Sequence, residues 1–391
     1  MATLGQMQTT SESINLTQRA RFTTYTPKAI LNKGRRADHW FWTRYSAYPY
    51  TGCQHGCAFC YCRERKYCPV DQAGNFEYDI RVKANAPELL RRALAKVPVD
   101  LVFTGDYQPA ERRFMLSRRM LEVCLDMGFP VFVLSRSHLV VRDLDLLVEI
   151  NARARSVVAF SIISTPKSTT NAIVRHLEGL SPPSERRFAA MEQVARAGIL
   201  TGTCCMPILP GITDDEPNFR DIAHATADHG GRFVLAGGLT LADPQRDHFL
   251  RLLGESFPQY LDRYAELYPV GSHAPVSWDW PRIGRHIREI CVEAGISDRI
   301  PRPITPGDGR ATTKRVVEML AERAYAAEVA GEPKSRAWDY RKAAWAIEDL
   351  EPDLGRVYAA MGSKGIEAIA GVGRRLGREI VAFLESLLQG A

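Results

Sequence analysis

Short runs of apolar residues alternate with longer amphipathic stretches between about residues 98 and 240. The short runs are rich in valine, isoleucine and phenylalanine, which favour strands, whereas the longer stretches repeat apolar residues at helical spacing. The pattern predicts strands at Asp100–Thr104, Val131–Ser135, Val157–Ile163, Thr201–Ile208 and Phe233–Ala236, and helices at Arg113–Met127, Leu144–Ala152, Ser184–Ala197 and Phe219–His229. Such alternation is typical of parallel βα units. About six units can be counted, so we expect an α/β fold with a partial (β/α)6 barrel rather than a closed eight-unit barrel.

The regions outside this alternation differ in composition. Residues 1–40 begin with a polar stretch rich in threonine and serine and predict a flexible N-terminal segment. We expect the barrel, with a helical extension from about residue 241, to occupy residues 41–305. The proline-rich segment Arg299–Gly309 is typical of a linker. Beyond it, residues 311–391 predict a small all-α domain, with helices at Thr312–Ala330 and Ser335–Leu350 and a final pair around Gly371.

Length and charge add limits to this picture. The 391 residues suffice for one large domain and a smaller one. The sequence contains no apolar run of membrane-spanning length and no secretory signal, which predicts a cytoplasmic protein that does not enter the membrane. Of the net charge of +6, residues 1–119 alone carry +9, from 19 Lys and Arg against 10 Asp and Glu. A basic N-terminal third favours a polyanionic partner such as nucleic acid, but it is equally typical of a solvated surface.

Five of the nine cysteines are crowded into one short stretch, at Cys53, Cys57, Cys60, Cys62 and Cys68. Without a secretory signal, such a cluster indicates metal binding rather than disulfides. The first three have the spacing C-x3-C-x2-C, and three thiolates can hold three irons of a [4Fe–4S] cubane. The fourth iron then lacks a protein ligand and is free to chelate S-adenosylmethionine. The alternative is a structural zinc site that uses Cys62, Cys68 or His55 as its fourth ligand, which the tight triple spacing fits poorly.

Four sequence segments carry a family resemblance: YPYTGCQHGCAFCY at 48–61, FTGDYQPAE at 103–111, LSRSHLVVRDLDLL at 134–147 and SIIST at 161–165. Together they resemble the radical S-adenosylmethionine (radical SAM) superfamily, and within it the spore photoproduct lyase-like branch, over about residues 25–305. The resemblance implies a [4Fe–4S] cluster, S-adenosylmethionine as the source of a 5′-deoxyadenosyl radical, and DNA as the substrate. It also implies an electron donor such as a flavodoxin or a ferredoxin.

The resemblance further implies which residues contact the cosubstrate. Thr104, Gly105 and Asp106 follow the second strand, where the family meets the amino group. Arg136 follows the third strand, where relatives place a basic side chain on the carboxylate, and a planar guanidinium suits that task. Ser161 or Ser164 would face the ribose.

One position departs from the lyase pattern. Phe103 stands where a hydrogen-donating cysteine is expected, so the hydrogen donor and the catalytic residue stay open. Cys62, Cys68, Cys204 and Cys205 are the other thiols available, although buried cysteines are commonly inert.

The C-terminal segment AIAGVGRRLGREIVAFL at 368–384 resembles a helix–hairpin–helix module. Its glycines let a DNA phosphate approach the backbone at a helix N-terminus. The implied DNA-binding residues are Gly371, Gly373, Arg374, Arg375 and Arg378. The preceding residues resemble the small N-terminal domain of family X DNA polymerases, but Glu379 occupies the position of that family's Schiff-base lysine. The resemblance therefore implies binding to the DNA backbone without lyase chemistry.

The sequence thus predicts a radical SAM enzyme that repairs or modifies DNA. Two alternatives stay open at this point. One keeps the radical chemistry but directs it at tRNA or a protein side chain. The other is a non-catalytic nucleic-acid-binding protein with an iron–sulfur cluster.

Overall fold

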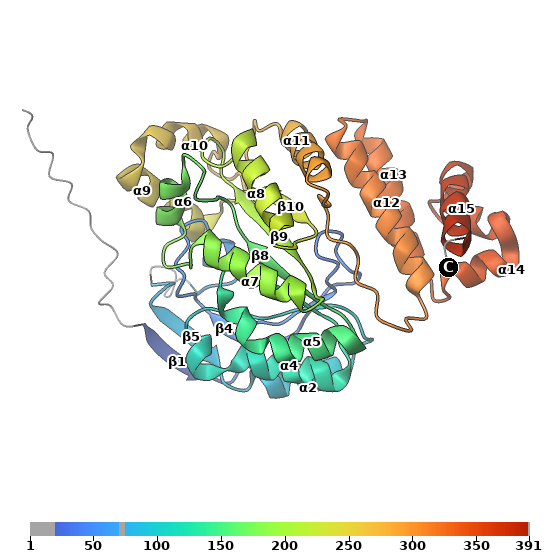
Figure 1. The fold of residues 1–391 in the computed structure, drawn as a ribbon, viewed down its shortest axis with the longest axis horizontal. Helices are drawn as coiled ribbons and strands as arrows, with labels where there is room; N and C mark the ends of the chain where they lie inside the picture. The colour runs from blue at the N-terminus through green and yellow to red at the C-terminus, as the bar shows by residue number, and fades with distance from the viewer. Residues whose placement is uncertain (1–19, 70–74, 390–391) are drawn as a thin grey trace, which may run out of the picture.

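A curled, mostly parallel sheet forms the centre of the computed structural model, which describes residues 20–69 and 75–389 (Figure 1). In this part of the chain the sheet has seven strands in the order β10-β9-β8-β7-β6-β3-β2. Six of them run parallel and β2 pairs antiparallel with β3 at one edge. The strands are β2 Asn32–Lys33, β3 Tyr45–Ser46, β6 Val102–Phe103, β7 Val131–Ser135, β8 Ser156–Ser161, β9 Leu200–Ile208 and β10 Val234–Gly238. The predicted partial (β/α)6 barrel is confirmed.

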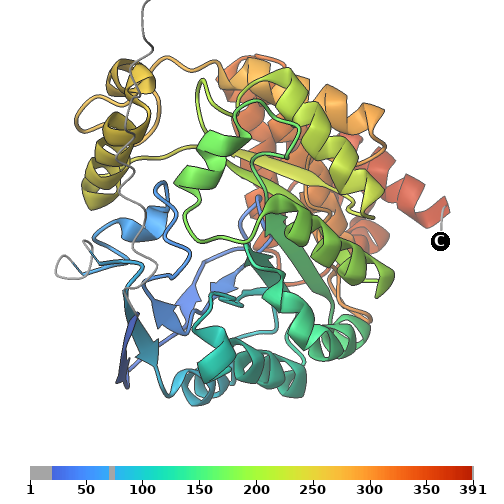
Figure 2. The ribbon, with the colours of Figure 1, turned by 60° about the vertical axis from the view of Figure 1, so that its left-hand side comes forward.

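Helices cover the outer face of this sheet (Figures 1 and 2). They are α2 Ala86–Leu94, α3 Glu111–Phe114, α4 Leu116–Met127, α5 Leu144–Arg153, α6 Asn171–Leu177, α7 Ser184–Arg196 and α8 Glu216–Asp228, with 3-10 turns η1 Tyr61–Arg63 and η2 His138–Asp143. Leu90, Met120, Leu147 and Met191 pack from four of these helices against outward-facing strand residues such as Val158. Strand β8 is buried along its whole length, and its four central residues are apolar on both faces, as is usual for parallel sheets.

A second, small sheet corrects one expectation. Its strands, in the order β1-β5-β4, are Arg21–Tyr25, Asp79–Lys83 and Tyr50–Thr51. The parallel pairing of β1 with β5 means that the described part of the expected flexible segment, residues 20–40, contains secondary structure. Residues 1–19 lie outside the described part of the chain. The sequence pattern missed β1 because its partner is nearly 60 residues away.

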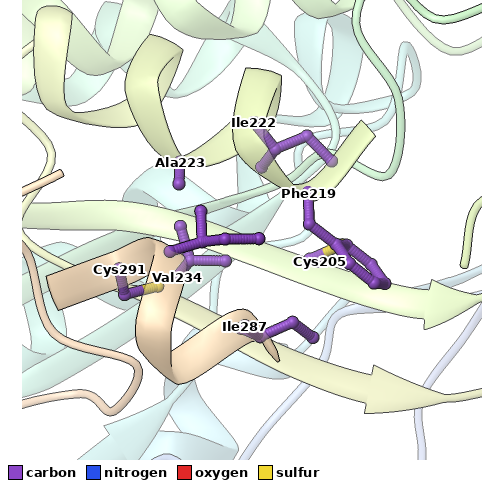
Figure 3. A pocket seen from close by; sticks show the side chains of 8 residues that line it. Cys205, Phe219, Ile222, Ala223, Val234, Ile287 and Cys291 are labelled. Carbon is purple, nitrogen blue, oxygen red and sulfur yellow. The ribbon is translucent and has the colours of Figure 1, made fainter. Parts of the chain in front are cut away.

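The helical extension after β10 consists of α9 Asp243–Ser256, η3 Pro258–Tyr260, α10 Leu261–Leu267 and α11 Trp280–Glu293. Helix α11 packs beside α8 against β9 and β10. Figure 3 shows the small apolar hollow between them, which includes Cys205 and Cys291. Its volume of about 10 Å³ holds at most one water, so we regard it as a packing defect. No helix in the described residues is long and apolar enough to cross a membrane.

Four C-terminal helices form a bundle: α12 Ala311–Val329, α13 Lys334–Glu348, α14 Leu354–Glu367 and α15 Gly373–Gln389. One apolar cluster joins this bundle to the interior of the barrel, because it contains Phe132 and Phe233 at the amino ends of strands together with Val316 and Leu320. The bundle therefore sits at the amino ends of the parallel strands, far from α6 and α9 (Figure 1).

The segment between the barrel and the bundle is also fastened. The indole of Trp42 donates a 2.8 Å hydrogen bond to the carbonyl of Ile300. Arg302 is buried, forms a bidentate pair with Glu348 of α13, and stacks on the Trp42 ring. The proline-rich segment thus crosses a packed interface rather than a contact-poor linker, and the bundle cannot be removed at residue 311 without exposing apolar surface.

Candidate cofactor site at the carboxyl ends of the strands

The three spaced cysteines lie on one tight loop between β4 and η1. Gly52 and Gly56 have φ of 82° and 68°, which allow the loop to turn twice within a few residues. Short backbone bonds close it, from Gly56 N to Cys53 O and from Cys60 N to Cys57 O. All three thiols are free. The loop therefore presents three thiols from an eight-residue stretch, as a cubane cluster requires.

One face of this cysteine loop rests on the segment between α6 and α7. Ala58 N donates to Leu177 O at 2.8 Å, and Leu180 N donates to His55 O at 2.7 Å. Gly179, between them, has φ +60°, and a Cβ there would lie 2.5 Å from the carbonyl oxygen of His55. A side chain at this position would push the two segments apart.

The thiol of Cys57 is held in the same interface. It lies 3.3 Å from the hydroxyl of Ser181 and 3.5 Å from the carbonyl of Glu178. Burial raises the pKa of this thiol, and the positive charge of Arg136 opposes that shift. Sequence patterns did not indicate Ser181, because its contact with Cys57 spans 124 residues.

The opposite face of the loop is fastened by Arg63 and Gln245. The buried guanidinium of Arg63 donates to the carbonyls of Cys57 and Gly56, each at 3.2 Å, and pairs with Glu77 at 3.0 Å. Gln245, at the start of α9, donates to Phe59 O at 2.9 Å. Neither residue was predicted from the sequence. Arg63 stands in a basic stretch of the sequence, and only the fold shows that it is buried.

Thr104, Gly105 and Asp106 follow β6 and lie beside the cysteine loop. The hydroxyl of Thr104 is fully buried and has no hydrogen-bond partner among the described residues. Gly105 has φ +91°, and a Cβ there would lie 3.0 Å from Val133. An orphaned buried hydroxyl costs about 1–3 kcal/mol unless a ligand satisfies it. This position therefore fits a bound polar group.

Asp106 is tied to the loop through Gln108. The amide of Gln108 donates to Gly52 O at 3.0 Å and to the Asp106 carboxylate at 3.1 Å, and its oxygen accepts from Gln54 N at 3.1 Å. Burial raises the pKa of Asp106 to about 7, with a further contribution from Glu111 and a lowering one from Gln108. The sequence analysis named Asp106 but not Gln108, whose role depends on its contact with a loop 54 residues earlier.

Arg136 follows β7 and is part of a buried ionic network. It donates to Glu178 at 2.6 Å and to the carbonyl of Met206 at 3.0 Å, and it stacks on the Phe59 ring. Arg187 and Arg175 share the same Glu178 carboxylate. Three guanidinium groups around one carboxylate leave excess positive charge beside the cysteine loop. Arg136 is thus positioned to bind an anion, but its bonds to Glu178 and Met206 already use some of its N–H donors.

The two predicted serines have protein partners. Ser161 ends β8 and donates to Met206 O at 3.0 Å. Ser164 is buried further along, 3.3 Å from the carbonyl of Thr165 and 3.4 Å from the side chain of Asn171. Ser161 therefore lies in the same group of contacts as Arg136, whereas Ser164 faces the start of α6.

The thiols suit a cluster better than a zinc ion. In residues 20–69 and 75–389, no three His, Cys, Asp or Glu side chains lie close enough together to hold one metal ion. A tetrahedral zinc ion needs all of its ligands grouped around one point. A cubane binds its three cysteines on three different irons, so these ligands lie further apart. A hydrogen bond from Cys62, together with Arg63 and Arg136, lowers the pKa of Cys60 to about 6, which favours the thiolate that iron requires.

The sequence profile described as the radical SAM superfamily matches residues 47–223, which span the cysteine loop, Thr104–Asp106, Arg136 and Ser161. With the partial barrel and the three-thiol loop, this match identifies residues 47–223 as a radical SAM region. The class uses a [4Fe–4S] cluster together with S-adenosylmethionine.

The fold is similar to that of spore photoproduct lyase. Two mutant forms of that enzyme superimpose with TM-scores of 0.50 and 0.51 at 15% identity, covering 70% and 71% of this chain and 78% and 81% of theirs. An uncharacterised protein of Mycobacterium tuberculosis is 28% identical over 243 residues, 60% of this chain and 70% of its own. One of Methanocaldococcus jannaschii is 28% identical over 174 residues, 44% of this chain and 63% of its own.

Proposed function

We propose that this radical SAM enzyme acts on DNA, repairing or modifying a base or a sugar. The radical chemistry is supported by one observation. The cysteine loop packs at the strand ends beside Arg136 and beside the Thr104 hydroxyl, which has no hydrogen-bond partner among the described residues. The DNA assignment draws support from the fold shared with spore photoproduct lyase and from the C-terminal hairpin. The fold alone would not name the substrate.

In this proposal Cys53, Cys57 and Cys60 hold the cluster. Once bound and reduced, the cluster supplies the electron that cleaves S-adenosylmethionine into methionine and a 5′-deoxyadenosyl radical. The chain's own residues bind and orient the cosubstrate. Thr104, Gly105 and Asp106 receive its amino group, because this edge offers a free hydroxyl and a carboxylate. Arg136 attracts its carboxylate, and Ser161 or Ser164 contacts its ribose.

The surroundings of the loop keep this region dry and rigid. Phe59 stacks on Arg136, and the ring of Phe103 packs against Phe41, Tyr48 and Phe132. Phe103 lacks the thiol hydrogen that a cysteine would donate, so the proposal assigns the hydrogen donor of a lyase reaction to another group. The proposal therefore extends to DNA modification as well as to repair.

The hairpin between α14 and α15 supports DNA as the partner. Gly371 and Gly373 have φ of 80° and 61°, so the turn adopts a conformation that larger residues resist. Arg374 and Arg378 are exposed and form no salt bridge with any residue in the described part of the chain. Arg375, in contrast, pairs with Asp339 and Glu379 and stacks on Tyr340, so it stabilises the bundle and is a weaker candidate for DNA contact than expected.

The decisive experiment is anaerobic turnover with reduced protein, S-adenosylmethionine and DNA of defined lesions or sequence, followed by mass spectrometry. We expect 5′-deoxyadenosine to form and the mass of a nucleotide to change. The Cys57→Ala variant is the control and should give neither product. If nucleotide masses changed only in tRNA, the substrate would be RNA rather than DNA. If cluster-loaded protein formed no 5′-deoxyadenosine, the protein would have a non-catalytic role.

A further inference from the structure

Two adjoining hollows lie between residues 35–40 and the bundle helices α12 and α13, at the opposite end of the barrel from the cysteine loop. The first has a volume of about 410 Å³, and its walls contain four arginines and three acidic residues: Arg35, Arg36, Arg44, Arg310, Glu348, Asp349 and Glu351. The second has a volume of about 260 Å³, and its walls combine four aromatic side chains with four charged ones: His39, Trp40, Tyr325 and Trp345 with Asp38, Arg299, Glu328 and Arg341. We call them the arginine hollow and the aromatic hollow.

The arginine hollow retains capacity for an anion. Arg35 and Arg36 share the single carboxylate of Asp349, and Arg44 lies 3.8 Å from Asp100 outside the hollow. The four arginines of the wall exceed its three carboxylates, Glu348, Asp349 and Glu351, by one positive charge. Arg310 donates to the backbone carbonyl of Glu348 at 2.7 Å, and the Glu348 carboxylate itself is taken by Arg302. The Nε atoms of Arg44 and Arg310 are buried and have no hydrogen-bond partner among the described residues. A phosphate offers oxygen acceptors that a planar guanidinium can bind in bidentate fashion.

The aromatic hollow has planar rings in its walls, and its two arginines are balanced by two carboxylates. Arg299 lies between two rings, 4.9 Å from the centre of Trp40 and 4.6 Å from that of Tyr325. Arg341 forms a bidentate pair with Glu328 on its wall. Trp40 is 39% exposed, which is unusual for so large an apolar side chain and leaves its ring accessible. Such planar groups stack on nucleobases of any sequence.

Arg36 joins the two hollows. It lines the arginine hollow, while its guanidinium lies 5.9 Å from the ring centre of Trp345 on the wall of the aromatic hollow. A phosphate site beside a stacking site matches the repeating unit of a nucleic-acid strand. Double-stranded DNA would not serve as well, because its bases are stacked inside the duplex and cannot enter the aromatic hollow.

We propose that the two hollows bind a segment of single-stranded nucleic acid, with a base in the aromatic hollow and the adjacent phosphate in the arginine hollow. The proposal rests on the proposed function in taking nucleic acid as the substrate class. It also gives a role to the excess positive charge of the N-terminal third, which supplies Arg35, Arg36 and Arg44.

The test is fluorescence anisotropy with a labelled 12-nucleotide single strand over a series of salt concentrations. Trp40→Leu should weaken binding about tenfold or more, since it removes a stacking surface. Arg35→Gln should weaken it less and lower the salt dependence by about 0.7 in slope, the loss expected for one phosphate contact on a single strand. Arg35 is 80% exposed, so its replacement leaves folding intact. Arg153→Gln, an exposed arginine on α5, is the matched control and should change nothing.

Three results would overturn the proposal: wild-type affinity in both hollow variants, an equal loss in Arg153→Gln, or a mononucleotide that binds as tightly as the 12-mer. The last would mean that the hollows take a free nucleotide. The outcome is separable from that of the proposed function. Turnover of DNA with unchanged binding in the variants would refute the hollows alone. Binding that depends on Trp40, without any DNA product, would refute the proposed reaction alone.

Discussion

At the scale of single residues, the cysteines divide by their surroundings. Cys53, Cys57 and Cys60 share one loop, whereas Cys124 and Cys291 are buried in separate apolar clusters. Burial raises the pKa of Cys124 and Cys291 to about 12, and it also raises the pKa of the Cys53 and Cys57 thiols. The two groups therefore differ in grouping rather than in burial, because only the loop cysteines have the close spacing that a shared cluster needs.

We predict that anaerobically reconstituted protein holds about four irons and four sulfides per chain. Replacing any of Cys53, Cys57 or Cys60 with alanine should abolish the cluster absorbance and iron content. Cys124→Ala and Cys291→Ala are matched controls and should retain both, with at most a lower melting temperature. Stoichiometric zinc without iron in freshly purified anaerobic protein would contradict the assignment.

Arg136 allows a second prediction at this scale. Arg136→Ala should weaken S-adenosylmethionine binding roughly tenfold, because charge-assisted hydrogen bonds are worth about 1.5–3 kcal/mol. Arg175→Ala is the control, since Arg175 pairs with the same Glu178 carboxylate. Isothermal titration of the cluster-loaded variants would separate the two. If both lose affinity equally, Arg136 acts through Glu178 and does not itself contact the carboxylate.

At the scale of elements, the local sequence pattern predicted the strands and helices correctly where each strand pairs with the next strand along the chain. The strand at Val131–Ser135 has the predicted bounds, because its apolar run is closed by Gly128 and Pro130 on one side and by polar residues on the other. The small sheet was missed because β1 must pair with β5, far along the chain. Spacing alone identified the cysteines, but Ser181, Gln108 and Glu178 became visible only through contacts that chain folding creates.

The contact between the cysteine loop and the α6–α7 segment gives a prediction about Gly179. Gly179→Ala combines a positive φ with a Cβ that would lie 2.5 Å from His55 O, so the two segments must separate. Gly198→Ala is an apt control, because it has φ +74° and open space around its Cβ. We expect both variants to lose stability, by about 1 kcal/mol for the positive φ alone, but only Gly179→Ala to lose iron. Iron retention by Gly179→Ala would show that the α6–α7 segment does not fix the loop.

At the scale of the whole molecule, the cluster loop and the helical bundle occupy opposite ends of the parallel strands. The loop lies at the carboxyl ends, as ligand sites in such sheets do, and the bundle closes the amino ends through a shared apolar cluster. A nucleotide bound at the loop is therefore not the one held by the hairpin. If the proposed function holds, the bundle would anchor a distant part of a long DNA and would not position the reacting nucleotide directly.

This separation predicts a dependence on DNA length. Gly371→Val should weaken binding of a duplex of roughly 40 base pairs, because valine resists the φ of +80° that the hairpin requires. Arg374→Gln should act more mildly and reduce the salt slope by about one, through a single phosphate contact. Turnover of a dinucleotide-sized substrate should be unaffected in either variant, since such a substrate reaches the loop without touching the bundle. Steady-state kinetics with both substrates, and anisotropy with the duplex, provide the measurement. An equal loss of activity on short and long substrates would mean that the hairpin stabilises the barrel and does not bind DNA. The DNA assignment would then depend on the reaction product alone.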